Sequence, residues 1–233
     1  LITLSNGVKV YVKKTDYTPN AISMRAISDG GDSYYSDDEY INASNADMVA
    51  MGGWGNFSAI ELNKKLAGIQ ASVSPSISSK AESLSGSCVK KDLETMLQLT
   101  YLCFTSPRKD ETVFKSSVER IKATIANREL DPTTALSDTI AKVVYDNNVR
   151  ALRTKVEDID KMNYDRIIEI YKERFADAND FTFFFVGDID IETLKPLLEQ
   201  YIATLPVLKS KEKLKYIDQK MSKGTITNIF EKQ

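Results

Sequence analysis

Apolar and polar residues alternate over the first thirty positions in the manner of β-strands. Residues 2–4 and 8–12 flank Asn6-Gly7, a strong hairpin signal because both residues tolerate positive φ. A third strand should follow and end at Gly30-Gly31. The positions expected on the buried sides of the second and third strands are Val8, Val10, Val12, Ile22, Met24 and Ala26.

Two Ser-x-x-Glu sequences, starting at Ser36 and Ser58, have the spacing of a capping box at a helix start. They predict one helix that runs to about Met51, and a second that ends near Gly68. Glycines at 52 and 53 should separate the two helices.

Strand patterns return at residues 69–74 and 84–88, and helical patterns follow. Apolar residues recur at helical spacing in three later segments, and residues 181–186 are almost all apolar, as in a central strand. Asp131-Pro132 and Asp190 have the positions of helix N-caps. The three stripes are Leu93, Met96, Leu97, Tyr101 and Phe104; Phe114, Val118, Ile121 and Ile125; and Ile167, Ile170, Tyr171 and Phe175.

This order of elements predicts the α+β class, with an antiparallel sheet and helices packed on one of its faces. One domain should cover residues 1–205. Residues 206–233 are expected to form a charged linker and the start of a following domain. Because the chain starts with Leu1 inside a strand pattern, we expect it to be a piece of a longer protein.

Composition excludes several classes of function. Of the 233 residues, 42% are hydrophobic and 27% charged, which is typical of a globular protein. A net charge of -2 gives no electrostatic reason to expect nucleic acid as a partner. No apolar run is long enough for a membrane span. The compartment stays undetermined, and in a bacterium the periplasm and the cytoplasm would both be compatible.

Histidine is absent from the chain, and this limits its chemistry. A zinc ion that activates water is usually held by imidazole, so a histidine-ligated hydrolytic site cannot be built from these residues. Cys88 and Cys103 cannot replace such a ligand set alone. We expect both to be buried free thiols, with a disulfide as the alternative.

Several other groups could carry chemistry, but each has a simpler structural explanation. A carboxylate cluster suits a helix start, a Gly-Trp-Gly sequence suits a loop anchored by its tryptophan, and alternating serines suit an exposed sheet face. Three arginines could bind a peptide carboxylate or lie solvated on the surface. These groups are Asp37, Asp38 and Glu39; Gly53, Trp54 and Gly55; Ser79 with Lys80; and Arg108, Arg150 and Arg153.

Four local sequences, in this order, resemble the insulinase/pitrilysin family of zinc metallopeptidases (the inverzincins). They are residues 4–10, Gly30-Gly31, residues 104–108 and residues 181–187. The resemblance extends from residue 1 to about residue 205. It implies a unit built of one α+β layer, of which family members contain several.

The resemblance also implies where a zinc site would lie. The family's inverted motif, His-x-x-Glu-His, falls on residues 45–49, where its two ligands and its glutamate are replaced by Asn45, Val49 and Met48. The third ligand of the family corresponds to Glu119. The chain therefore resembles a degenerate unit from the non-catalytic second half, with no catalytic or metal-binding residues, and core and helix-surface roles are the simpler interpretation of these positions.

From this resemblance we expect a non-catalytic segment that forms chamber wall and an interface to a catalytic half, in the same chain or in a separate subunit. The parent would be a zinc-dependent metalloendopeptidase, with zinc in its catalytic half and none in this piece, which should be inactive alone. The alternative is a purely structural or interaction protein of the same fold, such as a processing-peptidase-like or respiratory-complex core subunit. Unfolded peptides could touch the edge strand at residues 69–77, which makes Ser72 and Ser74 candidate substrate-binding residues.

Overall fold

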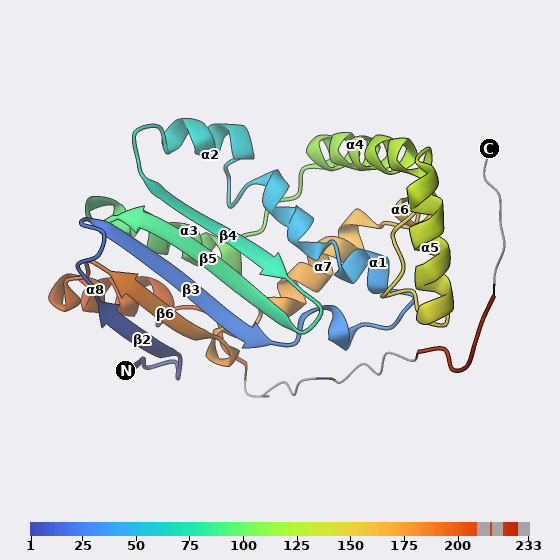
Figure 1. Cartoon of the computed structure of the whole chain (residues 1–233). Coiled ribbons are helices and arrows are strands. Elements are labelled where there is room, and N and C mark those ends of the chain that lie inside the picture. The colour runs from blue at the N-terminus through green and yellow to red at the C-terminus, as the bar shows by residue number, and fades with distance from the viewer. Residues whose placement is uncertain (209–214, 216–220, 228–233) are drawn as a thin grey trace.

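The structure, a computed structural model, describes residues 1–208, 215 and 221–227, and a six-stranded sheet is its centre (Figure 1). The strands lie in the order β1-β2-β6-β3-β5-β4. Their bounds are β1 Ile2–Thr3, β2 Lys9–Lys14, β3 Ala21–Asp29, β4 Ala71–Ile77, β5 Ala81–Val89 and β6 Thr182–Gly187.

The α+β class predicted from the sequence is confirmed, but the sheet is mixed rather than purely antiparallel. β6 lies between β2 and β3, and it runs parallel to β2 and antiparallel to β3. The order of strands along the chain does not reveal this insertion. A long helical segment separates β5 from β6 in the sequence, so the direction in which β6 returns is set by how those helices pack.

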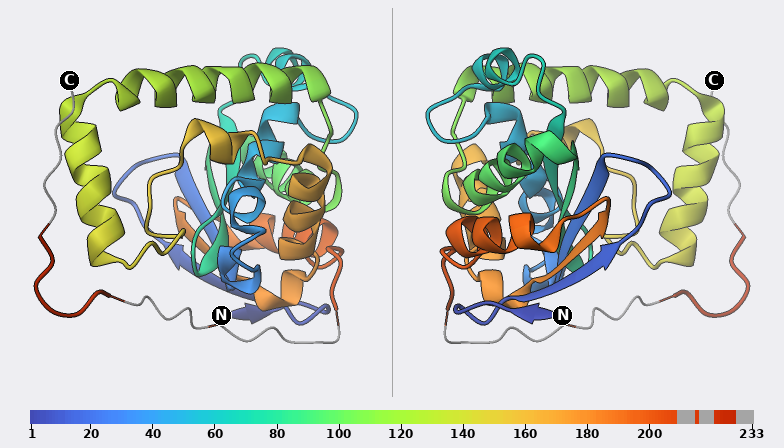
Figure 2. Two further views of the ribbon diagram at one scale, coloured as in Figure 1. Left: turned by 90° about the vertical axis from the view of Figure 1, so that its right-hand side faces the viewer. Right: turned by 90° about the vertical axis from the view of Figure 1, so that its left-hand side faces the viewer.

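Helices α3, α7 and α8 lie behind the sheet as Figure 1 shows it, and α4 and α5 form a bent arm that extends away from it (Figures 1 and 2). The expected packing of helices on one sheet face is therefore present. The α-helices are α1 Tyr40–Ala43, α2 Ala59–Lys65, α3 Leu93–Thr105, α4 Glu111–Glu129, α5 Pro132–Val144, α6 Val156–Ile159, α7 Tyr164–Arg174 and α8 Ile191–Leu197. Short 3₁₀ segments are η1 Gly31–Tyr34, η2 Ala46–Gly52, η3 Lys90–Asp92 and η4 Ala178–Asp180, and η5 Leu198–Ile202 is a π-helical turn.

The single helix expected up to Met51 is wrong in detail. The segment divides into the one-turn helix α1 and the 3₁₀ segment η2. The Ser36 capping box does not form, since Glu39 is the N-cap of α1 and makes no side-chain capping bond. Instead, the Glu39 carboxylate pairs with Arg166 at 2.7 Å. A tertiary ion pair has replaced the local cap.

The other predicted helix starts are confirmed. Ser58 and Glu61 form a capping box at α2, with each side chain bonded to the other residue's backbone amide. The Asp131 carboxylate accepts from the Thr133 amide at 2.8 Å, ahead of Pro132 at the first helical position. Asp190 caps α8 in the same way.

Aromatic rings from three elements form the centre of the core. Phe104 of α3 makes edge-to-face contacts with Phe175 of α7 and with Phe181, which precedes β6, at centroid distances of 5.4 and 5.0 Å. Tyr171 of α7 stacks on Phe175, and its hydroxyl donates to the Cys103 carbonyl oxygen at 2.9 Å. The expected stripes of α3 and α7 are largely buried, whereas in the α4 stripe only Ile125 is buried.

Cys88 and Cys103 are buried free thiols, as the sequence predicted. Burial and the charge of Asp92 raise the pKa of Cys88 to about 12, and burial also raises the pKa of Cys103. Neither thiol is therefore suited to nucleophilic chemistry at neutral pH.

The expected linker lies mostly outside the described residues. Lys209, Lys211, Glu212 and Lys213 fall there, while Lys215 is described and exposed. The domain boundary at residue 205 stays a prediction. Across the described stretches 1–208, 215 and 221–227, no helix has both the length and the apolarity needed to span a bilayer.

We expect adjacent phenylalanines of β6 to differ sharply in their contribution to stability. Phe183 is fully buried on the helix-covered face, whereas Phe184 is 38% exposed on the other face. Phe183→Ala should lower the free energy of unfolding by about 3–5 kcal/mol because it leaves a cavity. Phe184→Ala should cost less than about 1 kcal/mol. Urea denaturation of both variants measures the difference, and equal losses would contradict this assignment of faces.

The native protein should react slowly with a thiol reagent such as Ellman's reagent at pH 8. At that pH little of either thiol is present as thiolate, because burial raises the pKa of both groups. In denaturant both thiols should react quickly and titrate as two equivalents. Cys88→Ser serves as the control that isolates Cys103. Rapid labelling of the native chain would show that a thiol is accessible.

Candidate functional site

The positions of the expected zinc motif lie where β3 leads into α1 and η2, and their side chains serve the fold. The Asn45 amide nitrogen donates to the Ile41 carbonyl oxygen at 2.8 Å. Met48 is 6% exposed and Val49 is fully buried in the core. The interpretation of these residues as core and helix-surface positions is therefore confirmed.

Glu119 does not point towards this segment. Its side chain is 73% exposed on α4 and pairs with Lys122 at 3.4 Å, and Lys122 also pairs with Asp160. In the described part of the chain, no three His, Cys, Asp or Glu side chains are grouped so that they could hold a metal ion. One amide, one thioether and one aliphatic side chain are not the ligands of a hydrolytic zinc. The residues present do not fit that ion.

Asp47 is the one acidic residue within the five motif positions, and it lies beside the neighbouring edge strand. Burial raises the pKa of Asp47, and the nearby backbone amide of Ile77, the last residue of β4, partly opposes the rise. The Asp47 carboxylate thus lies near a strand amide that points outward from the sheet edge.

The register of β4 shows which of its amides are available at the sheet edge. The Val89 amide donates to the carbonyl oxygen of residue 70, and the Ser78 amide donates to the Ala81 carbonyl oxygen, so even-numbered positions between them pair with β5. Odd-numbered positions direct their backbone groups outward. Pro75 is one of these and has no N–H. The Ile77 amide lies beside the Asp47 carboxylate, and Ala71 and Val73 hold the remaining outward donors of the strand.

Ser72 and Ser74 lie on this edge strand, but their backbone groups pair with β5. Their side chains are exposed on the face of the sheet that the helices leave uncovered, and the two hydroxyl oxygens of Ser72 and Ser87 lie 3.1 Å apart. A peptide added to the edge would bond to Ala71 and Val73 instead. Contact of Ser72 and Ser74 with a substrate stays a prediction.

The three arginines considered for peptide binding all have internal partners. The Arg150 side chain is 8% exposed and binds the Asp32 carboxylate at 3.0 Å and the Asp37 carboxylate at 2.8 Å. Burial raises the pKa of Asp32, and the charge of Arg150 opposes this shift. Arg108 binds Asp110, and Arg153 binds Asp138. These guanidinium groups hold loops together.

The remaining sequence candidates are also explained by the fold. Asp37 and Glu39 form tertiary ion pairs with Arg150 and Arg166, so their acidic cluster does not face a common ligand. Trp54 is 5% exposed and forms isolated bridges with Phe57 and Pro107, as expected of a loop anchor. Ser79 and Lys80 occupy the turn between β4 and β5.

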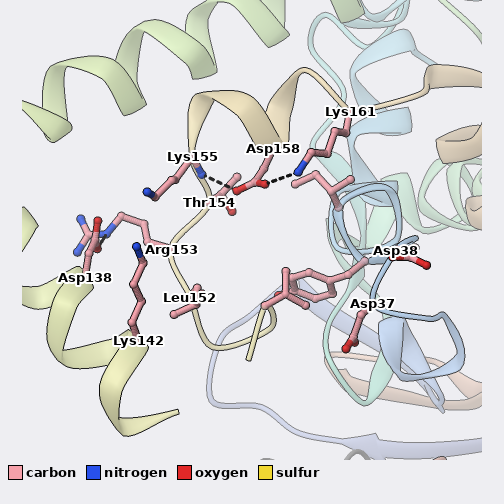
Figure 3. A pocket seen from close by; sticks show the side chains of 13 residues that line it. Asp37, Asp38, Asp138, Lys142, Leu152, Arg153, Thr154, Lys155, Asp158 and Lys161 are labelled. Atoms are coloured by element: carbon pink, nitrogen blue, oxygen red, sulfur yellow. Dashed lines mark hydrogen bonds and ion pairs between the residues drawn. The ribbon is translucent and has the colours of Figure 1, made fainter. Parts of the chain in front are cut away.

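A cavity of about 490 Å³ lies between α1, α5 and the loop that follows α5 (Figure 3). Its charged side chains are largely paired within the chain, as in Arg153 with Asp138 at 2.9 Å and Lys161 with Asp158 at 3.0 Å. Such neutralised pairs leave little net field for a charged ligand. The geometry assigns no chemistry to this cavity.

Sequence analysis missed Asp47 and Pro75. Pro75, within an alternating strand pattern, does indicate an edge strand, because proline is tolerated in a sheet where its position needs no ladder hydrogen bond. Asp47 gave no comparable signal, since its partner lies thirty residues further on and was brought to it only by tertiary folding.

Comparison with known proteins places these features in context. The family described as "Peptidase M16 inactive domain" matches residues 161–232. The chain is 28% identical over 210 residues to "Zinc protease PQQL-like" of Arabidopsis thaliana, covering 88% of this chain and 19% of that protein. It spans about a fifth of the length of the relatives that it matches in sequence.

Solved structures show the same fold. The crystal structure of the periplasmic protease PqqL from Escherichia coli superposes with a TM-score of 0.79 at 20% identity, over 92% of this chain and 24% of that one. The peptidase M16 inactive domain from Pseudomonas fluorescens superposes with a TM-score of 0.69 at 15% identity, over 91% of this chain and 53% of that one. The predicted resemblance to the insulinase/pitrilysin peptidases is confirmed.

Restoring the outward-facing amide donors of β4 should make its edge more prone to pair with a strand of another molecule. In the double variant Asp47→Ala, Pro75→Val, the amides of residues 75 and 77 would both face outward without partners. We expect strand-mediated self-association at lower protein concentration than for the wild type, measured by size-exclusion chromatography with light scattering. Pro19→Val, in an exposed loop, is the matched control. An unchanged oligomeric state in the double variant would show that these two residues do not protect the edge.

Proposed function

Because this chain resembles the inactive domain of M16 zinc peptidases in both sequence and fold, we propose that it is a non-catalytic unit of such a peptidase. In this role it forms part of a chamber wall and an interface to a catalytic half. That half lies in the same polypeptide or in a separate subunit, and it hydrolyses peptides with its own zinc ion.

The side chains found at the motif positions are the main support for this proposal. Asn45 is bonded to the backbone, and Met48 and Val49 are buried, so recruiting these positions for zinc would require unpacking the core. Packing side chains into the core at these positions stabilises the fold and removes the means to activate water. The unit keeps the scaffold of the family without its reaction centre.

The edge strand supports the same conclusion. A peptide that adds to a sheet edge needs a continuous row of outward N–H and C=O groups. β4 lacks one such donor at Pro75, and the Asp47 carboxylate lies beside another at Ile77. The two remaining outward amides, at Ala71 and Val73, are suited to a weak contact with an unfolded peptide rather than to the extended strand pairing that positions a peptide for cleavage.

Reconstitution tests the proposal directly. The purified, tag-free chain should contain no stoichiometric zinc and should not cleave fluorogenic peptides. Mixed with a catalytic half encoded by the same or the neighbouring reading frame, it should raise peptide turnover at least about tenfold over that half alone, because it completes the reaction chamber.

The control is a catalytic half whose motif glutamate is changed to glutamine, which should stay inactive after mixing. Stoichiometric zinc or peptidase activity in this chain alone would contradict the proposal. Turnover that does not change on mixing would contradict the interface role.

A further inference from the structure

The two faces of the sheet differ in what covers them. Helices α3, α7 and α8 lie on one side, and the other side faces the viewer in Figure 1 with no described helix across it. We call this second side the open face. It is formed by the alternate residues of each strand whose neighbours point into the core.

Register shows how side chains are arranged on the open face. Its middle row crosses five strands, in the order Tyr11, Phe184, Arg25, Ser85 and Ser74. The row changes from aromatic on β2 and β6, through a cation on β3, to hydroxyls on β5 and β4. The open face therefore has an apolar half and a hydroxyl-bearing half.

The apolar half is too exposed for a sheet face that only meets water. Tyr11 and Phe184 stack with their ring centroids 5.3 Å apart and are 43% and 38% exposed, and Val186 beside them is 41% exposed. Antiparallel sheets with one solvated face usually carry polar residues there. A contiguous aromatic and aliphatic patch on such a face marks an interaction surface.

Charge in the rows of the open face that cross β6 is of one sign. Lys9 and Lys13 lie on either side of Tyr11 along β2, and Arg25 lies opposite Phe184. In the described residues none of these three cations has an ion-pair or hydrogen-bond partner. The nearest acid on the same side of β3, Asp29, lies at the strand's end, beyond the rows that cross β6.

We propose that the open face docks an acidic amphipathic helix whose apolar stripe covers Tyr11, Phe184 and Val186. A helix fits because the central strands have their backbone groups engaged in the sheet, so recognition must come from side chains, and helix on sheet is a stable layer. Lys9 and Lys13 are separated by about 13 Å along the strand. Two turns of helix span about 11 Å, so carboxylates two turns apart reach both lysines.

The hydroxyl-bearing half favours the same occupant. Its side chains are small, as Ser74 and Ser85 illustrate, and they carry no charge that would repel an acidic segment. A helix lying over the aromatic pair can also approach closely on this side. Arg25 lies at the boundary, where it can bind a carboxylate from the edge of the docked helix.

This inference deepens the proposed function and rests on it, because it identifies a surface by which the unit would join its assembly. It depends on the open face alone and not on the motif positions or on the edge of β4. The docked helix would belong to another part of that assembly.

A designed peptide tests the proposal. The probe is a fluorescein-labelled helix of about 18 residues, about 27 Å long, with leucines along one stripe and glutamates beside them. The comparison peptide has lysine in place of every glutamate. The 233-residue chain should bind the acidic peptide at least about tenfold more tightly than the basic one by fluorescence anisotropy, and the preference should weaken as salt is raised.

Matched variants locate the binding surface. Lys9→Glu with Lys13→Glu should weaken binding of the acidic peptide about tenfold or more, whereas Lys115→Glu with Lys172→Glu, at exposed lysines on α4 and α7, should leave it unchanged. Phe184→Ser should weaken binding to a similar extent, and Leu136→Ser, at a residue that is 51% exposed on α5, should not. Circular dichroism checks that each variant is folded.

Two results would overturn the inference. The first is equal affinity for the two peptides, or affinity that the open-face variants leave unchanged. The second is absence of peptide binding together with a concentration-dependent dimer that Phe184→Ser abolishes, which would assign the face to a second copy of this chain. Failure here with intact stimulation of the catalytic half would reject the docking surface and leave the proposed function standing.

Discussion

The insertion of β6 between β2 and β3 is the constraint on which the rest of the structure depends. It joins an amino-terminal hairpin to strands that would otherwise form a separate sheet, across about 170 residues of chain. The same strand and the residue before it, Phe181, bring two buried rings into contact with Phe104. Backbone pairing and aromatic packing thus support each other, because the ladder fixes the strand's position and the rings fill the space behind it.

The degenerate motif follows from this packing. Residues 45–49 lie beside β4 and against α7, and the core has taken over positions that an enzyme of this fold would expose to a metal ion. Asp47, the remaining acid, lies beside the backbone amide of Ile77 at the end of the edge strand. Its carboxylate is therefore placed to act on the edge strand from within the motif positions.

Surfaces that the fold leaves uncovered have a common character. The open face carries stacked aromatic rings beside cations that have no partner among the described residues, and α5 extends from the body with Leu136 and Ile140 about half exposed. Neither arrangement is expected of a unit that meets only solvent. Internal ion pairs such as that between Arg150 and Asp32 hold the loop after α5 to the body, so the arm has a fixed origin.

Local patterns in the sequence determined much of this protein. The alternation in β3, β4 and β5, the caps of α2, α5 and α8, and the absence of a histidine-ligated zinc all follow from residues that act on near neighbours or from residue types that are missing. Tertiary structure alone decided the parallel pairing of β6, the division of the expected helix into α1 and η2, and the roles of Glu39, Asp47 and Arg150. Each of these depends on a partner distant in the sequence, and such contacts override local propensity because burial and pairing are worth more than a cap or a helical turn.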